Sequence, residues 1–348
     1  MVILGIETSC DESAASIVKF DKKEGRLFVL ANIISSQIDI HKEYGGVIPE
    51  IAAREHVGQI IPVIDTALKK AKLNYKEIDY IAVTKGPGLV TSLLSGIETA
   101  RSLAFAWKKP LIEVNHISGH IYANFIDNYK QIKYPAIILT VSGGHTNLIL
   151  MDKNLKLKII GETLDDAAGE AYDKAAKMLG LGYPGGPVIA KQAQIYFKQN
   201  KKQEKSDILL PRPMLNDKTF NFSFSGLKTA LLYRLQKDQN WPNRIPEYCF
   251  KFQEAVNLVL VKKTINAAIK YKAKSVLLSG GVSANLDLRE KLETAVKEIP
   301  KKTKFFSPKL QYTTDNAAMI AAAGIFSAQK GKIKDFSQIK ADPNWNLR

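Results

Sequence analysis

The chain has 348 residues, and its 50 lysine and arginine residues outnumber its 34 aspartate and glutamate residues, which gives a formal net charge of +16. This length favours two domains over one, and no apolar run approaches the roughly 20 residues that a membrane span needs. Only Cys10 and Cys249 are present, too few for a disulfide framework. Because the acidic residues Glu7 and Asp11 follow the first apolar run at once, a signal peptide is excluded and we expect a cytoplasmic protein without a membrane partner.

The positive charge admits two interpretations. A large excess of basic residues is typical of proteins that bind a polyanion such as nucleic acid. A generally lysine-rich composition explains it equally well, since many lysines are dispersed among polar loops, as Lys201, Lys202 and Lys205 are. Charge alone therefore does not decide between them.

Two polar hairpins open the two halves of the chain. The first has strands at 2–7 and 14–20 around a turn rich in hydroxyl and carboxylate groups. The second has strands at 136–141 and 146–151 around the turn Ser142-Gly143-Gly144-His145. The repetition of this plan predicts a duplicated architecture.

Strands and helices alternate after each hairpin, which predicts an α/β fold. We expect domains at 1–134 and 135–330, a basic insertion at about 197–225, and a tail at 331–348, with the C-terminal helix packing back on the first half. In the first half, Gly86-Pro87-Gly88 is interpreted as a structural turn. The elements expected after the hairpins are helices at 49–73, 90–106, 165–179, 248–272 and 285–299, and strands at 78–84, 110–114 and 275–278.

Two histidines four residues apart, His116 and His120, follow the strand at 110–114. If a helix begins near Ser118, this spacing brings both imidazoles to one side of the junction, where they could share a metal ion. A capping and packing arrangement is the alternative. A third candidate ligand is Asp315, which opens a helix of small residues, and two imidazoles with one carboxylate form a facial set with open coordination positions.

Glycine-rich turns supply candidate sites for an anion. Ser142-Gly143-Gly144 is either an anion nest or a plain hairpin turn, and Ser279-Gly280-Gly281, which precedes a helix, is a place for an anion or a nucleotide. No P-loop sequence occurs, and Ile117 stands where a zinc protease has its general-base glutamate. A P-loop ATPase and a peptidase are therefore disfavoured.

Several carboxylates and one thiol remain open in role. Glu7, Asp11 and Glu12 surround the first hairpin turn, where they could hold a cation, repel phosphate or orient a nucleophile. Asp173 reads as a helix-surface carboxylate paired with Lys177. Cys10 reads as a small buried hydrophobe, with a reactive thiol as the alternative.

Taken in order, these motifs closely resemble those of the tRNA N6-adenosine threonylcarbamoyltransferases, from about residue 1 to residue 330. The stretch from Asn221 to Thr229 resembles the bacterial and organellar branch of that family. The matching segments are Gly5 to Glu12, Gly45 to Glu50, Gly86 to Leu89, the His116/His120 pair, Val141 to Thr146, Ser279 to Asn285, and Tyr312 to Asn316.

The resemblance implies the fold of actin, the sugar kinases and Hsp70, with two duplicated α/β domains around a nucleotide cleft. It implies transfer of the threonylcarbamoyl group from threonylcarbamoyl-AMP to N6 of the adenosine 3′ of the anticodon, in tRNAs that read codons beginning with A, with release of AMP. It further implies two helper proteins, a shorter actin-like paralogue and a small P-loop ATPase, and a separate synthase that supplies the donor. A small-molecule kinase of the same fold and a non-catalytic actin-like scaffold are the rival functions.

Site residues follow from the same resemblance. His116, His120 and Asp315 would hold one divalent metal, iron in the usual family description, with zinc or magnesium as alternatives. Asp11 and Glu12 are candidate catalytic groups. Many family members carry an aspartate at the position of Ala190, and its absence leaves Asp173 as the expected partner of the ribose hydroxyls. The expected substrate-binding residues are Thr140, Val141, Ser142, Gly143, Gly144, Asp173, Gly186 and Asn285.

Overall fold

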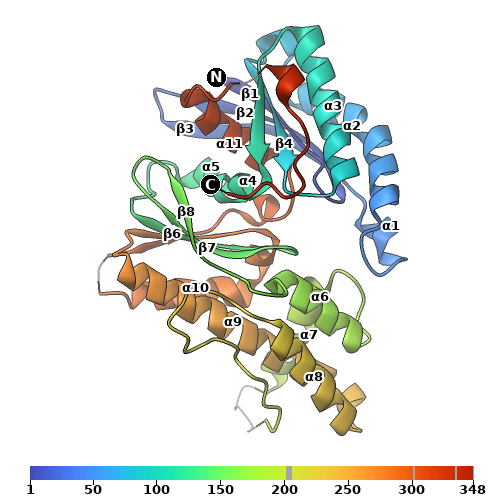
Figure 1. Cartoon of the computed structure of the whole chain (residues 1–348), viewed down its shortest axis with the longest axis vertical. Helices are drawn as coiled ribbons and strands as arrows, with labels where there is room; N and C mark the ends of the chain where they lie inside the picture. Colours follow the sequence, from blue (N-terminus) through green and yellow to red (C-terminus); the bar gives the residue numbers. More distant parts are fainter. Residues whose placement is uncertain (201–205, 301, 334, 348) are drawn as a thin grey trace. The chain divides into compact units, whose positions relative to one another are not determined.

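The computed structural model describes residues 1–200, 206–300, 302–333 and 335–347. The chain divides into two compact units (Figure 1, where colour follows the residue number). Unit 1 comprises Met1–Ile132 and Pro308–Arg348, and unit 2 comprises Lys133–Ser307. Within the described part of the chain, no helix is long and apolar enough to cross a membrane.

Unit 1 is built on a mixed five-stranded sheet in the order β3-β2-β1-β4-β5. The first three strands are antiparallel to one another, and β4 and β5 continue from β1 as parallel strands. The carboxyl ends of β1, β4 and β5 therefore lie at one edge of the sheet. The strands are β1 (Val2–Glu7), β2 (Glu12–Asp21), β3 (Arg26–Ser36), β4 (Tyr80–Gly86) and β5 (Leu111–Asn115).

Alternation along β1 assigns its side chains to two faces. Leu4 and Ile6 join an apolar core with α2 (Pro49–Ala71) and α3 (Val90–Trp107). Gly5 lies on the opposite face, where α11 (Ala317–Gln329) packs against the strand. Glu7 follows Gly5 on this second face.

The second face also carries α4 (His116–Ala123), which packs against α11. The shorter helices of unit 1 are α1 (Ile38–Lys42) and α5 (Phe125–Asn128). The second half, expected to run to residue 330, ends at residue 307, because α11 buries its small apolar residues against β1, β2 and α4 of unit 1.

The C-terminal segment runs along unit 1. The N–H of Asp342 donates to the carbonyl of Lys85 at 2.9 Å, and Asn115 Nδ2 donates to the carbonyl of Trp345 at 2.8 Å. Ile339 is fully buried in the core with α3. These contacts attach the segment to the end of β4 and to the start of α4.

Unit 2 repeats the plan of unit 1. Its sheet has the order β10-β9-β6-β7-β8, again with three antiparallel strands followed by two parallel ones. The duplication predicted from the two hairpins is therefore confirmed. The strands are β6 (Ala136–Val141), β7 (Thr146–Met151), β8 (Leu157–Glu162), β9 (Ser275–Ser279) and β10 (Lys304–Phe306).

The helices of unit 2 enclose a second core around β6 and β9. The largest contribution comes from the long helix α9, which buries Phe252, Val256 and Leu260. Residues 201–205 of the predicted basic insertion, with Lys201, Lys202 and Lys205, lie outside the described residues. The helices are α6 (Ala168–Met178), α7 (Gly185–Gln199), α8 (Ser225–Lys237), α9 (Ile245–Lys270) and α10 (Leu286–Lys297).

Candidate metal centre

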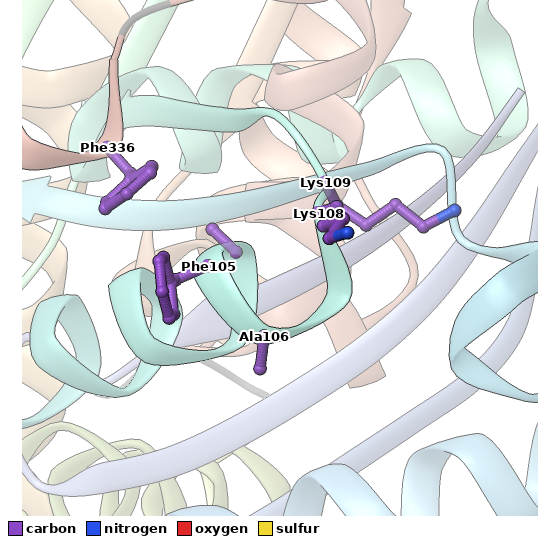
Figure 2. Close-up of a pocket in the computed structure, with 6 residues that line it drawn as sticks. Phe105, Ala106, Lys108, Lys109 and Phe336 are labelled. Atoms are coloured by element: carbon purple, nitrogen blue, oxygen red, sulfur yellow. The ribbon is translucent and has the colours of Figure 1, made fainter.

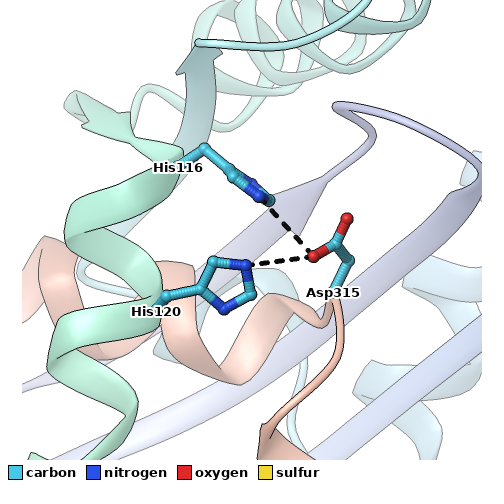
Figure 3. A group of neighbouring side chains, drawn as sticks. All are labelled: His116, His120 and Asp315. Carbon is cyan, nitrogen blue, oxygen red and sulfur yellow. Dashed lines mark ion pairs between the residues drawn. The ribbon is translucent and has the colours of Figure 1, made fainter. Parts of the chain in front are cut away.

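Three side chains from distant parts of the sequence meet in unit 1. His116 and His120 lie on α4, directly after β5, and Asp315 lies just before α11 (Figure 3). Oδ1 of Asp315 is 3.5 Å from Nε2 of His116 and 3.2 Å from Nε2 of His120. The helix begins at His116 rather than near Ser118, because the Asn115 side chain caps it by accepting from the Ser118 N–H at 3.1 Å.

The geometry of this group fits a metal ion. One ligand atom from each residue lies within 4.8 Å of the others, and the two imidazole rings stand at 81° to each other. Both His120 nitrogens are buried, and neither forms a hydrogen bond of good geometry within the described residues. Buried imidazole nitrogens normally have partners, so this arrangement suits coordination better than a packed pair.

The two histidines differ in their electrostatic surroundings. Burial lowers the pKa of His116, but the carboxylates of Asp315 and Glu7 outweigh burial and raise that pKa to about 9. For His120, burial prevails over Asp315 and lowers the pKa. In both rings the nitrogen that faces Asp315 is Nε2.

Glu7 lies behind His116, on the side away from Asp315. Its Oε2 is 3.3 Å from Nδ1 of His116 and accepts from the Thr84 hydroxyl at 2.6 Å. Its Oε1 accepts from the Ser9 N–H at 2.5 Å. Burial would raise the pKa of this carboxyl, but the neighbouring His116 prevails and the pKa is lowered.

The turn between β1 and β2 carries the candidate catalytic carboxylates. Asp11 and Glu12 are mostly buried, and the hydroxyl of Ser36 donates to Glu12 at 3.3 Å. Burial and the carboxylates of Asp11 and Asp315 raise the pKa of Glu12 well above its usual range. Burial and the same acidic neighbours raise the pKa of the Cys10 thiol, which argues against the reactive-thiol interpretation of Cys10.

In unit 2, the turn after β6 presents free backbone donors. The carbonyls of Ser142 and Gly143 accept from the first N–H groups of α6, at 3.2 and 3.1 Å. Among the described residues, no acceptor is recorded for the N–H groups of Gly143 and Gly144, whose backbone is exposed. A Cβ at Gly169 would lie 2.5 Å from the Ser142 carbonyl, so glycine is needed there for the helix to approach the turn.

The other expected substrate-binding residues lie near this turn or on the helices around it. The hydroxyls of Thr140 and Ser279 are 2.9 Å apart. Asp173 accepts from the Gly185 N–H at 2.7 Å, and within the described residues it forms no ion pair with Lys177, so the surface-pair interpretation is wrong. Burial raises the pKa of Asp173.

Gly186 and Asn285 lie at helix starts. Gly186 is the second residue of α7, which begins at Gly185. Asn285 caps α10 by accepting from the Leu288 N–H at 3.0 Å, and its amide donates to Gln253 at 2.7 Å.

A separate pocket lies at the C-terminal end of α3 (Figure 2). It measures about 530 Å³, and Phe105, 72% exposed, meets Phe336 at its rim. The lining contains two lysines and no carboxylate, histidine or hydroxyl group, so it offers no acid–base pair or metal ligands. Its lining residues are Ala104, Phe105, Ala106, Lys108, Lys109 and Phe336.

The two mixed five-stranded sheets of identical topology place the chain in the actin-like, sugar kinase and Hsp70 fold class. The solved structure of HypF from T. kodakarensis matches this fold with a TM-score of 0.62 at 13% identity, covering 95% of this chain and 48% of that one.

Sequence comparison identifies the family. The family model for tRNA N6-adenosine threonylcarbamoyltransferase matches residues 28–322. The Bacillus subtilis protein of that name is 50% identical over 333 residues, 95% of this chain and 92% of its own. The Thermosipho africanus protein of that name is 46% identical and matched over the full length of both chains. The chain belongs to the tRNA N6-adenosine threonylcarbamoyltransferase family.

Sequence reasoning left the surroundings of His116 undefined. The sequence pattern places Glu7 only among three carboxylates at the first hairpin turn, and it assigns no role to Thr84. The available signal was positional, since both residues stand at or near the carboxyl ends of neighbouring parallel strands, where polar side chains gather. The order of strands in the sheet was needed to bring them together.

Proposed function

We propose that the protein transfers the threonylcarbamoyl group of threonylcarbamoyl-AMP to N6 of the adenosine 3′ of the anticodon, in tRNAs that read codons beginning with A, and releases AMP. The observation that carries this proposal is the family match over residues 28–322. The group of His116, His120 and Asp315 gives the proposed reaction a chemical centre.

His116, His120 and Asp315 are proposed to hold one divalent metal. Two imidazoles and one carboxylate are the ligand set of non-haem iron(II) sites and also suit zinc, so iron is the first choice, with zinc or magnesium as alternatives. A bound divalent metal supplies a fixed positive charge for phosphate or carbonyl oxygens that gain negative charge during transfer.

Unit 2 is proposed to bind the adenylate part of the donor. Backbone N–H groups of Gly143 and Gly144, the hydroxyl of Ser142 and the N-terminal end of α7 at Gly186 are donors suited to a phosphate. Asp173 is the proposed partner of the ribose hydroxyls, and the remaining contacts are assigned to Thr140, Val141 and Asn285.

The transfer itself needs no covalent enzyme intermediate. The N6 amine of adenine attacks the carbonyl carbon of the donor, the new C–N bond forms as the bond from carbon to the phosphate oxygen breaks, and AMP leaves. The mixed anhydride is already activated, so the main task of the protein is orientation. We assign Asp11 and Glu12 as the candidate groups that accept the N6 proton.

The proposed partners follow from the family. tRNA is the acceptor, and the net charge of +16 favours its binding. A shorter actin-like paralogue and a small P-loop ATPase are the proposed helpers, and a separate synthase is the proposed source of threonylcarbamoyl-AMP.

Incubation of the purified protein with threonylcarbamoyl-AMP and unmodified tRNA, with and without the two helpers, tests the proposal by mass spectrometry of the nucleosides. We expect threonylcarbamoyladenosine from the wild type and a loss of at least about a hundredfold from Asp315→Ala, since one of three ligands is removed. Asp39→Ala, a change at a surface carboxylate that is 93% exposed, should transfer normally.

Three outcomes would contradict the proposal. Wild-type activity in a folded Asp315→Ala variant would remove the metal assignment. Phosphorylation of a small molecule from ATP without tRNA would favour a kinase of the same fold, and a protein inactive in both assays but bound to its helpers would favour a scaffold.

A further inference from the structure

We propose that Glu7 is a positioning residue of the metal centre, which holds the ring of His116 so that Nε2 faces the metal and Nδ1 carries the proton. This inference rests on the proposed metal-binding function of His116, His120 and Asp315. In this proposal Glu7, a carboxylate of β1, does not bind the metal itself but orients one of the metal ligands.

The contacts around His116 define two sides of its ring. On one side, Nε2 is 3.5 Å from Oδ1 of Asp315. On the other, Nδ1 is 3.3 Å from Oε2 of Glu7 and 3.0 Å from Oγ of Ser9. The ring therefore lies between the ligand carboxylate and a second, fully buried carboxylate.

The other partners of Glu7 determine which ring nitrogen bears the proton. Oε2 accepts from the Thr84 hydroxyl and Oε1 from the Ser9 N–H, so both carboxylate oxygens act as acceptors. A carboxylate that only accepts requires an N–H opposite it. Nδ1 of His116 is the remaining group that faces Oε2, and the Ser9 hydroxyl oxygen beside it can also accept. Nδ1 therefore keeps its proton, and Nε2 is the nitrogen left to bind a metal.

The sheet fixes this arrangement. Glu7 ends β1, Thr84 lies near the end of β4, and His116 directly follows β5, and these are three adjacent parallel strands. Glu7 projects on the face of β1 that carries α4 and α11, because it lies two residues after Gly5, which α11 contacts. The carboxylate is thus held by backbone geometry as well as by hydrogen bonds.

His120 provides the contrast. No hydrogen-bond partner is recorded for its Nδ1 among the described residues, and its helix is held by packing against α11, where Gly119 meets the side chains of Ile320 and Met319. Metal-bound histidines usually donate their second ring N–H to a carboxylate or carbonyl, and loss of that partner weakens metal binding. Among the described residues of this site, only His116 has such a carboxylate.

The test is Glu7→Gln, which keeps the size of the side chain and removes its charge. In a competition titration of Zn²⁺ or Co²⁺ against a chromophoric chelator, we expect binding about tenfold to a hundredfold weaker than in the wild type. Glu113→Gln is the matched control, because Glu113 is also a mostly buried carboxylate of unit 1 but pairs with Lys85 at 3.2 Å. Its affinity should equal that of the wild type.

A second readout observes the ring directly. The chain has only five histidines, so ¹⁵N-histidine labelling of the Zn²⁺-loaded protein gives a readable NMR spectrum, with His116 assigned by comparison with His116→Ala. We expect its proton on Nδ1, exchanging slowly with water in the wild type and rapidly in Glu7→Gln.

Wild-type metal affinity in a folded Glu7→Gln variant, or a proton on Nε2 of His116 in the wild type, would overturn the inference alone. Equal metal affinity of the wild type and His116→Ala would overturn the proposed metal centre itself. If Glu7→Gln does not fold by circular dichroism, Thr84→Val decides the question, since it keeps the carboxylate but removes a hydroxyl that holds it. Weaker metal binding by Thr84→Val supports the inference, and unchanged binding contradicts it.

Discussion

His56 is a buried histidine whose two ring nitrogens both have hydrogen-bond partners within the protein. Its Nδ1 is 2.7 Å from the Ser13 hydroxyl, and its Nε2 is 3.0 Å from the Cys10 carbonyl. Because a carbonyl only accepts, Nε2 carries the proton and Nδ1 accepts from Ser13, which leaves the ring neutral. His120, on α4, has no such pair of partners in the described chain. This difference is the residue-scale argument that His120, unlike His56, binds a metal.

The neutral ring of His56 predicts a loss of stability in acid. Burial holds the pKa of His56 below its ordinary value of 6.5, so the unfolded chain binds a proton there before the folded chain does. The stabilising contribution is therefore complete above pH 6.5 and decreases as the pH falls below it. Urea unfolding of the wild type and His56→Gln at about pH 7.5 and pH 5.5 should show a larger loss for the wild type, by on the order of 1 kcal/mol.

Equal losses for both proteins would show that His56 does not titrate differently in the folded chain. The same result would also show that the proton assigned to Nε2 of His56 does not explain a lowered pKa of this histidine.

At the scale of elements, α11 reaches β1 because Gly5 has no side chain. A Cβ there would lie 2.4 Å from the Ala317 carbonyl and 2.8 Å from the Ala321 N. Both are backbone atoms, which cannot move without displacing the helix. Since Asp315 lies just before this helix, the close approach also sets the place of the third candidate ligand.

Gly5→Ala should therefore affect stability and metal binding together. We expect a loss of about 1–3 kcal/mol in the free energy of unfolding, as is usual for overpacking, with weaker Zn²⁺ binding because Asp315 moves with α11. Chemical unfolding and the chelator titration measure the two effects.

Gly58→Ala is the control for that change. Gly58 lies within α2, where an added Cβ would meet none of the described atoms within 4 Å apart from its own helix backbone and chain neighbours. Alanine should therefore stabilise the protein by about 0.5–1 kcal/mol. A Gly5→Ala variant as stable as Gly58→Ala would show that α11 does not pack closely enough against β1 to exclude a Cβ at residue 5.

The sequence predicted the first and last residues of some strands correctly and missed other elements. β6 and β7 have the predicted bounds, because apolar runs flank a glycine-rich turn. β3 was not predicted, since its inward and outward residues do not alternate cleanly, although Gly25, at positive φ, ends the turn directly before it. α6 begins at Ala168 rather than Asp165, because Asp165 instead accepts hydrogen bonds from Ser223 and Ser225.

At the scale of the whole molecule, the candidate site depends on contacts between distant segments. Spacing along the chain suggested that His116 and His120 share one side of a helix, and the start of a helix of small residues added Asp315 as a third candidate. Only the folded sheet shows that Asp315 lies close to both rings and that Glu7 contacts one of them. Such contacts depend on the order of strands, which local sequence pattern does not determine.

The net charge of +16 is a property of the whole chain, and it predicts salt-sensitive binding of tRNA. Lysine and arginine contacts to phosphates release counterions, so affinity falls as salt rises. We expect the affinity for unmodified tRNA to decrease about tenfold or more between about 50 and about 200 mM NaCl, measured by filter binding. An affinity that does not change with salt concentration would show that surface charge does not recruit tRNA.

The central claim is that His116, His120 and Asp315 hold one divalent metal, and the metal content of the purified protein tests it most directly. Elemental analysis after loading and removal of free metal should find about one ion per chain in the wild type and in Asp39→Ala, and much less than one in His116→Ala, His120→Ala and Asp315→Ala. One tightly bound ion per chain in all three ligand variants would contradict the account.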